Sequence, residues 1–343
     1  MRSSALAVLV AVASIAAAFA AQDTLDIYFI DVEGGQSTLL VMPGGQSMLI
    51  DSGYPDNGSR DPDRIMAAVR EARLSRLDYL VITHFHEDHV GGAAELARRI
   101  PIDTFVDYGA PVQTASEVVA TFNAYEAVRR TRRHLVAAPG DRLPFHSADV
   151  EANIVAADGA RLSAPLDGGG QPNPACTDFE RRQINRTENP RSIALRVRFG
   201  AFRFFDPGDL DPNTLGDLVC PTNLIGQVDA FLVAHHGSSD TNVPVLLPAL
   251  RPRAAIFNNG EYKGGSASWL QTLRETPGIE QGVWQLHRSL GDGAEYNFPD
   301  AFIANLGGDA GDRGSWIKLS AAKDGAFTVT NGRTGETRSY PRR

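Results

Sequence analysis

The sequence predicts an α/β protein in which two β-rich halves, each covered by helices, pack face to face as a four-layer αβ/βα sandwich. Short apolar runs alternate with helix-like stretches from Leu25 onward. A polar stretch rich in Gly and Pro at 160–188 predicts a long loop, and the alternation of strands and helices starts again after it. We expect a single domain over residues 22–343, a length that suits one large domain.

The first half begins with three short strands joined by tight turns, because its apolar runs are separated by the sequences EGGQ and GGQ. Asp61 and Pro62 then predict a helix start, with a capping residue and a proline at the first helical position. The expected elements are strands at 25–32, 37–43, 47–53 and 77–84, a helix at 89–100, and strands at 103–109 and 149–157 with a helix between them.

The second half repeats this organisation and ends in a hairpin. The tail from Trp316 contains the turn sequence KDGA, which predicts a hairpin at about 315–340. The expected strands are 192–200, 202–209, 229–237, 254–260 and 283–287, with helices between them, one starting at Ser266.

Residues 1–21 are typical of a secretory signal peptide. A basic Arg2 precedes an apolar run at 5–19, and small residues at Ala18 and Ala20 form an A-x-A cleavage site. The apolar run is short for a membrane span and no second one follows. We therefore expect an exported protein, periplasmic or extracellular, with no membrane span after signal removal.

The charge of the chain indicates which molecules it could bind, and its two cysteines raise the question of a disulfide. The chain has 33 basic and 41 acidic residues, so it has no general attraction for phosphate backbones. The one basic cluster, at 129–134, lies at an expected helix end, so we expect a small-molecule or envelope-derived substrate and no nucleic-acid surface. Nothing in the sequence indicates an oligomeric state. In an oxidising compartment Cys176 and Cys220 could pair, although the sequence does not show that they are close.

The stretch THFHEDHVGG, residues 83–92, places three of the eight histidines within six positions. His84, His86 and His89 have spacings that cannot share one face of a helix, which needs i, i+3 or i+4. A loop at a strand end can turn them and Asp88 toward one point. Imidazoles and a carboxylate converging there favour a divalent transition metal.

Two later strands end in similar residues. The run FRFFDPGDL ends in Asp206 and Asp209, and DAFLVAHHG ends in His235 and His236. Five of the eight histidines therefore follow two strands, and this concentration favours a metal site over scattered structural histidines.

These motifs resemble those of the metallo-β-lactamase superfamily. HFHEDH resembles its H-x-H-x-D-H signature, and LIDSG resembles its early Asp-Gly turn. Within the superfamily, ENPRSIALRV, PGDL and VAHHGSSDTN are similar to the metallo-hydrolase domain of bacterial DNA-uptake competence proteins (ComEC-like) and their stand-alone relatives. The similarity covers roughly residues 25–289 and implies the metallo-β-lactamase fold.

The resemblance implies two zinc ions per chain. His84 and His86 would bind the first, and Asp209 would bridge to the second. Asp88, which would also act at the nucleophile, His89 and His235 would bind the second. His235 is preferred over His236 because it comes first off the strand, and His236 would then lie behind it or give a proton to the leaving group. Two cations about 3.5–4 Å apart can hold a hydroxide at neutral pH and stabilise the oxyanion that forms.

The sequence departs from the superfamily pattern in two places. A further metal-binding His is expected between Asp88 and the GD motif, but only His134 and His146 lie there and neither ends a strand. As in the competence branch, ENPRS offers Asn189 and Ser192 near the site instead, so the first metal site is expected to be weaker or completed by solvent. The turn DVEGGQS also differs from the Gly-Gln-Gly-Asp run of that branch.

Other residues are candidates for positioning or substrate contact. Asp51 is expected to order the loops around the ligands, and His287, at the end of another strand, is either a site residue or an ordinary buried histidine. The residues that could contact substrate, with a plain turn as the alternative for the last three, are Ser238, Asn258, Asn259 and Lys263.

The function that these observations favour is an exported zinc-dependent hydrolase of an ester-type bond, with a phosphoester or phosphodiester preferred through the resemblance. β-Lactamase or lactonase activity is the alternative within the same chemistry. A redox di-iron centre and a non-catalytic metal-binding module are the alternatives of another class. The first of these needs a flavin partner domain, and no Gly-rich dinucleotide loop is present in the sequence.

Overall fold

The computed structural model describes residues 23–55, 57–279, 281–307 and 314–343. The expected signal peptide, residues 1–21, lies outside this part of the chain. Within it, none of the helices has both the length and the apolar character that a membrane crossing requires.

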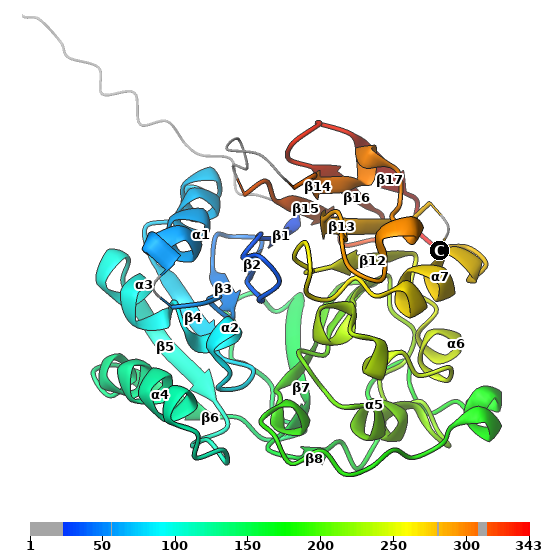
Figure 1. Cartoon of the computed structure of the whole chain (residues 1–343), viewed down its shortest axis with the longest axis horizontal. Helices are drawn as coiled ribbons and strands as arrows, with labels where there is room; N and C mark the ends of the chain where they lie inside the picture. The colour runs from blue at the N-terminus through cyan, green and yellow to red at the C-terminus, as the bar shows by residue number, and fades with distance from the viewer. Residues whose placement is uncertain (1–22, 56, 280, 308–313) are drawn as a thin grey trace, which may run out of the picture.

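Two mixed sheets form the centre of the molecule (Figure 1). We call the nine-stranded one the first sheet; its strand order is β17-β16-β15-β1-β2-β3-β4-β5-β6. Its strands are β1 (Leu25–Phe29), β2 (Thr38–Val41), β3 (Ser47–Ile50), β4 (Leu77–Val81), β5 (Ile102–Asp107), β6 (Arg133–Val136), β15 (Ile317–Ala321), β16 (Phe327–Asn331) and β17 (Thr337–Tyr340).

The second sheet is eight-stranded, with the order β14-β13-β12-β11-β10-β9-β7-β8. Strands β10 to β14 are parallel to one another, whereas the pairs β10–β9, β9–β7 and β7–β8 are antiparallel. Its strands are β7 (Val150–Ala157), β8 (Ala160–Arg161), β9 (Ala194–Phe199), β10 (Phe202–Asp206), β11 (Ala230–Leu232), β12 (Ala254–Phe257), β13 (Val283–His287) and β14 (Ile303–Asn305).

Helices cover the outer face of each sheet. Figure 1 shows α1, α3 and α4 outside the first sheet and α5, α6 and α7 outside the second. The predicted α/β class with two sheets is confirmed, and the helices complete four layers. The helices are α1 (Arg60–Glu71), α2 (Glu87–Val90), α3 (Ala93–Arg99), α4 (Ser116–Arg129), α5 (Pro212–Val219), α6 (Leu246–Leu250) and α7 (Ala267–Glu275).

Two apolar cores hold the layers together. One includes side chains from both sheets, for example Phe29 of β1 and Phe204 of β10, whose ring centroids are 5.7 Å apart. The other lies between the second sheet and its helices, where Phe231 of β11 packs against Trp269 of α7. Burial of apolar area on this scale is the main favourable term in folding, and it fixes the strand ends that carry the polar residues.

One expected helix is interrupted at the polar cluster. The sequence predicts a helix over 89–100, but the structure has α2 and α3 with Gly91 and Gly92 between them. A Cβ on Gly92 would lie 2.2 Å from the carbonyl oxygen of Ser52, and one on Gly91 would lie 2.3 Å from Pro55. The glycines therefore let the 51–55 loop pack closely against this turn.

Other boundaries differ where local signals are short. Helix α1 starts at Arg60, so Asp61 lies in its first turn, and the Asp61 carboxylate accepts a hydrogen bond from the Tyr54 backbone instead of capping the helix. The tail has β15 and β16 as an antiparallel hairpin, and β17 extends the sheet by one strand. The sequence did not indicate β6, β8, β14 or β17, which are short or exposed.

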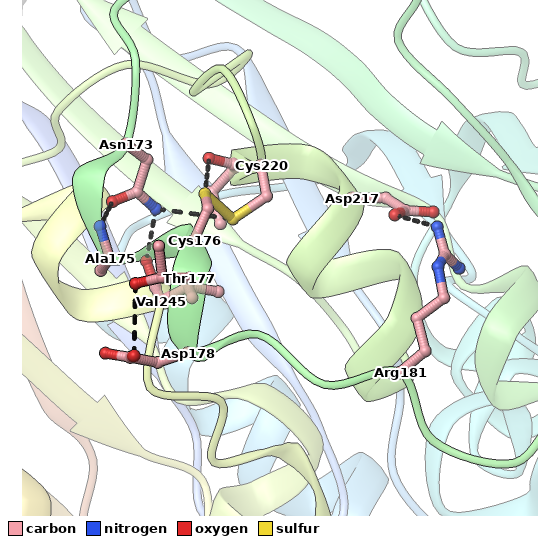
Figure 2. Close-up of a disulfide and its surroundings, with 10 residues drawn as sticks. Asn173, Ala175, Cys176, Thr177, Asp178, Arg181, Asp217, Cys220 and Val245 are labelled. Carbon is pink, nitrogen blue, oxygen red and sulfur yellow. Dashed lines mark hydrogen bonds and ion pairs between the residues drawn. A yellow bond between two sulfur atoms is a disulfide. The ribbon is translucent and has the colours of Figure 1, made fainter.

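A disulfide joins Cys176 to Cys220, with Cα atoms 5.6 Å apart. Figure 2 shows it beside Asn173, whose side-chain amide donates to the carbonyl of Val245 at 3.0 Å. Arg181 in the same segment pairs with Asp217 of α5. The loop predicted at 160–188 is thus attached to the helices that cover the second sheet.

Candidate metal centre

The polar cluster lies where strands of both sheets end. Strand β4 leads into His84 and His86, while β10 ends just before Asp209 and β11 leads into the turn η4 (Ala234–Gly237). Contact between the two sheets brings these ends together: the Ile193 backbone amide donates to the carbonyl of Thr83 at 2.8 Å. The site is therefore shared between the two halves of the molecule.

Four residues form the most compact group. One ligand atom from each of Asp88, His89, Asp209 and His236 lies within 4.8 Å of the others. His89 Nε2 is 3.2 Å from Asp88 Oδ2 and 3.2 Å from Asp209 Oδ2. His236 Nε2 is 3.2 Å and 3.4 Å from the same two oxygens. Two imidazoles and two carboxylates at this spacing can hold a divalent cation.

His84 and His86 lie at one side of this group. His84 Nε2 is 3.8 Å from Asp209 Oδ2 and 3.0 Å from His86 Nδ1. His86 Nε2 is 2.8 Å from the side-chain oxygen of Gln113. The two histidines and Asp209 thus form a second set of donors next to the first, as the sequence suggested.

The structure reverses the expected placement of His235 and His236. His236 is buried and belongs to the four-residue group, whereas the His235 side chain is 24% exposed and its Nε2 is 3.6 Å from Asp209 Oδ2. The prediction assumed an extended strand, on which neighbours alternate. Both residues instead have left-handed backbone angles, with φ of 50° and 56°. The chain therefore leaves the extended conformation before His235, and the alternation of side chains along a strand does not apply to the pair.

Asp51 holds His89 in place. Its carboxylate is 2.7 Å from His89 Nδ1 and accepts hydrogen bonds from the backbone and hydroxyl of Thr83, at 2.7 Å and 2.6 Å. This leaves His89 Nε2 facing the other ligand-type residues. Asp51 lies where the sequence placed it, as a residue that orders the loops around the site.

Asn189 and Ser192, in the segment that leads into β9, lie beside two of the histidines. The Asn189 side-chain nitrogen is 3.4 Å from His235 Nε2, and Ser192 Oγ is 3.3 Å from His84 Nδ1. Ser192 also accepts from the Asp209 backbone amide at 3.3 Å. Neither lies in the four-residue group, while His134, which pairs with Asp107, belongs to a separate network.

Lys263 is the cation closest to the group. Its ammonium pairs with Asp88 Oδ2 and lies 3.0 Å from the hydroxyl of Tyr54. The turn at 33–36 packs against the same place, since a Cβ on Gly35 would lie 2.4 Å from the Asp88 carbonyl oxygen. Lys263 is therefore brought to the site, although it comes from the loop after β12.

The remaining substrate-contact candidates lie elsewhere or serve the framework. Asn259 is fully buried and donates to the carbonyls of Gly260 and His287, at 3.0 Å and 2.9 Å. Asn258 donates to Gln36 at 3.3 Å, and Ser238 lies half-buried in the turn after His236. These bonds give both residues partners within the framework, and the expected substrate contact stays a prediction.

His287 belongs to a different cluster. Its Nε2 lies 2.8 Å from Asp31 Oδ1 and 3.4 Å from Glu33 Oε2. Arg64 pairs with the same two carboxylates, at 2.6 Å and 2.9 Å. The guanidinium already supplies the positive charge, so this cluster is an ion-pair network that fastens the turn at 31–36 to the end of β13.

The charges of the group favour metal ligands. Burial raises the pKa of Asp88 and of Asp209, but the neighbouring histidines outweigh it and bring both well below their ordinary value. Burial and the charge of His89 lower the pKa of His84, which keeps it a neutral imidazole. Burial lowers the pKa of His89, whereas Asp209, Asp88 and Asp51 raise it well above its usual value. A bound cation would replace the proton on His89.

Several supporting residues were not predicted from the sequence. Gln36 donates to Asp206 at 3.1 Å, and Glu188 accepts from the backbone amide of Gln113, the partner of His86, at 2.7 Å. Tyr54 contacts Lys263. Each lies in a loop far along the chain from its partner, so no local sequence signal identifies it.

One known protein family matches part of this chain. The model described as the metallo-beta-lactamase superfamily matches residues 30–165, which include Asp51 and the cluster at 84–89. Residues 30–165 are thus similar to the metallo-beta-lactamase superfamily, in agreement with the resemblance of the sequence motifs. The narrower likeness to the competence branch stays a prediction.

Individual proteins similar to the chain are also metal-dependent hydrolases by description. A curated metal-dependent hydrolase of Staphylococcus saprophyticus is 35% identical over 65 residues, which cover 19% of this chain. The chain matches 25% of the length of that relative.

Two solved structures share a looser similarity with about three quarters of the chain. A protein described as a metal-dependent hydrolase, from Parabacteroides distasonis ATCC 8503, has a TM-score of 0.43 and 15% identity, covering 76% of this chain and 92% of its own. A metallo hydrolase of the hyperthermophilic archaeon Ignicoccus hospitalis KIN4/I has a TM-score of 0.40 and 13% identity, covering 79% and 96%.

Proposed function

We propose that this protein is an exported hydrolase that uses two zinc ions to cleave an ester-type bond, with phosphoesters or phosphodiesters as the favoured substrates. The observation that carries the proposal is the buried group of Asp88, His89, Asp209 and His236, with His84 and His86 beside it. The proposal for export depends on the character of residues 1–21.

The residues fit a metal. Among the described residues, the buried Oδ1 of Asp209 has no hydrogen-bond partner, and a buried carboxylate oxygen without one is costly. Imidazole nitrogen and carboxylate oxygen are the donors that zinc takes in catalytic sites. His84, His86 and Asp209 would hold one ion, and Asp88, His89, His236 and Asp209 the other.

When bound, such ions acidify water and polarise the ester oxygen. The chain's own residues do the positioning. Asp51 keeps His89 Nε2 directed at the ligand group, and Asn189 and Ser192 hold His235 and His84 from the second sheet. Burial of the group keeps bulk water away from it, which strengthens electrostatic interactions inside.

His235 is placed to give a proton to the leaving group. Its side chain is partly exposed, unlike that of His236, and it lies beside the ligand group, with Nε2 3.6 Å from Asp209 Oδ2. A general acid needs access to substrate as well as proximity to the reacting atoms. This role exchanges the two that the sequence suggested for His235 and His236.

Lys263 and Tyr54 support an anionic substrate. The Lys263 side chain is 39% exposed and its ammonium already pairs with the Asp88 carboxylate, so binding of cations there would free it to turn toward an incoming negative group. The Tyr54 hydroxyl, 3.0 Å away, would accept from the same ammonium. Both suit a phosphoester better than a neutral ester.

The adjacent histidines provide a matched test. His236→Ala should lose bound zinc and activity together. His235→Ala should keep most of its zinc and lose roughly 10²–10⁴-fold in rate, least for substrates with good leaving groups. Metal content and turnover of the two purified variants decide between the roles. Zinc lost only from the His235 variant would restore the assignment made from the sequence.

The substrate is tested with a panel at fixed zinc. Phosphomonoesters, phosphodiesters, lactones and a chromogenic cephalosporin cover the leading proposal and its alternatives. Hydrolysis of the phosphorus compounds that falls in Lys263→Gln and not in Lys323→Gln, an exposed lysine elsewhere, supports the proposal. Cleavage of the lactone or cephalosporin alone would replace it.

Export is tested separately in the native host. Mass spectrometry of the mature protein should find an N-terminus near Ala21 or Gln22. Intact Met1 on protein from the cytoplasm would contradict export and leave the hydrolase proposal standing.

A further inference from the structure

A group of arginines lies at the edge of the second sheet opposite the metal centre. Arg203 is the second residue of β10, and Arg251 and Arg253 immediately precede β12. Strands β10, β11 and β12 are parallel, so their starts share one edge and their ends, which lead into the metal-ligand residues, share the other. The arginines are therefore not part of the hydrolase site.

Two cavities meet at this edge, of about 760 and 410 Å³, and both are lined by Pro248 and Arg251. The larger one is walled mainly by apolar side chains of the segment at 243–252 and by Pro277, and its lining also includes Glu275 at the end of α7. The smaller one is polar. Its side-chain donors are Gln171, Asn173, Arg203, Asn223, Gln227 and Arg251, and no carboxylate lines it.

The positive charge at this edge exceeds the negative charge that faces it. Within the described residues, Arg251 has no carboxylate within 4.0 Å, and Arg203 has only Asp167, at 3.3 Å, whose side chain is 73% exposed. The buried Nε of Arg203 has no hydrogen-bond partner among those residues. Arg253 and Arg343 both take Asp229 as their carboxylate, at 2.8 Å and 3.5 Å.

A further guanidinium, that of Arg196, bonds to the chain close to two residues of the polar cavity, Gly168 and Asn223. Arg196 is 1% exposed and donates to the carbonyls of Asp167 and Ile225, at 2.6 Å and 3.0 Å, with no carboxylate within 4.0 Å in the described part of the chain. Together with Arg203, Arg251, Arg253 and Arg343, it makes five guanidiniums near three carboxylates, those of Asp167, Asp229 and Glu275. A chain with a formal net charge of −8 thus concentrates positive charge at one place.

We propose that these two cavities bind a small amphiphilic anion, with its phosphate or carboxylate group in the polar cavity between Arg203 and Arg251 and its apolar chain in the larger cavity. Arginine forks match the geometry of such oxyanions. Cavities of this size bury most of a ligand of a few hundred daltons. Since Arg251 lines both, the charged and apolar parts of one molecule would be joined beside it.

The disulfide anchors the segment that forms one wall of the polar cavity. Asn173 and Pro174, which line it, lie just before Cys176, and the Asn173 side chain is held by the Val245 carbonyl (Figure 2). Cys220 fastens this segment to the end of α5. The shape of the polar cavity thus depends on a cross-link that the metal centre does not touch.

The test measures binding of decyl phosphate, below its micelle-forming concentration, to the full chain by calorimetry. Inorganic phosphate and decyl maltoside serve as the anionic and apolar halves alone. Decyl phosphate should bind saturably, at least tenfold tighter than either. Arg251→Gln and Arg203→Gln should each weaken it about tenfold or more, whereas Arg132→Gln, an exposed arginine after α4, should not. Val243→Thr should weaken decyl phosphate and leave inorganic phosphate unchanged.

Two results would overturn the proposal. One is an equal effect of Arg251→Gln and Arg132→Gln, since binding would then follow overall charge. The other is loss of decyl phosphate binding in His236→Ala with retention in Arg251→Gln, since the anion would then occupy the metal centre. Normal binding by a His236→Ala protein that is inactive supports this site whatever the outcome for the hydrolase.

Discussion

Asp51 orients His89 without belonging to the group of candidate ligands. Replacing its carboxylate by an amide tests this role. In Asp51→Asn the amide keeps its size but loses the negative charge that holds the proton on His89 Nδ1, 2.7 Å away. His89 Nε2 would then be less basic and less well directed. We expect zinc affinity to fall about 10–100-fold, as for other carboxylates behind a histidine ligand.

Competition with a coloured chelator measures that affinity. Asp141→Asn is the control, because Asp141 is exposed and its carboxylate accepts from the backbone amide of Ala138 at 2.9 Å, away from the metal centre. Equal zinc affinity in the two variants would show that the Asp51 carboxylate does not orient His89.

At the residue scale, the structure brings together residues that the sequence singled out, although not in the expected order. His84, His86, Asp88, His89 and Asp209 meet because they lie in the segments that follow β4 and β10, and apolar runs reveal these strands. The order of His235 and His236 depends on their two left-handed φ angles. The sequence AHHG does not predict these angles, because residues other than glycine seldom adopt this conformation. The burial of Asn259 likewise depends on a residue distant in the sequence, His287, whose backbone carbonyl accepts a hydrogen bond from the Asn259 side chain.

At the scale of elements, the glycine pair between α2 and α3 determines how closely the 51–55 loop approaches the ligands. Gly92→Ala would place a Cβ 2.2 Å from the Ser52 carbonyl oxygen, so the loop that carries Asp51 must move. We expect a loss of about 1–3 kcal/mol in the free energy of unfolding, the usual cost of overpacking, together with weaker zinc binding.

Gly291→Ala is the matched control for this prediction. A Cβ on Gly291 has no atom within 4 Å and no unusual φ, so its effect should stay within about 0.5 kcal/mol. Denaturant unfolding and zinc titration of both variants provide the two readouts. If the Gly92 variant matches the Gly291 variant in both, the close approach does not matter for the site.

The elements themselves were predictable where the chain is periodic and long. Strands β1 to β4 and β10 to β13 are buried apolar runs bounded by turn residues, and each was expected. Strands β6 and β17 have only partly buried or exposed side chains, so neither shows a clear pattern. The break between α2 and α3 follows from contact with another loop, which a local helix signal cannot show.

At the scale of the whole molecule, the candidate metal ligands come from both sheets. A bound metal is therefore expected to stabilise the folded chain against unfolding. Asp88 and His89 follow β4 of the first sheet, whereas Asp209 and His236 follow β10 and β11 of the second. A cation that binds all four can do so only when the two halves are packed together. It therefore binds the folded chain and not the unfolded one, which raises the free energy of unfolding.

We expect zinc at a thousandfold excess over its dissociation constant to stabilise the fold by about 4 kcal/mol, and the unfolding temperature to rise by several degrees. A chelator should reverse the rise. His236→Ala removes a ligand from the second sheet and should show a much smaller rise, while His146→Ala, an exposed histidine outside the site, should keep all of it. The measurement is thermal unfolding of each protein with zinc and with chelator. An equal rise in all three would mean that zinc stabilises the molecule somewhere other than between the two sheets.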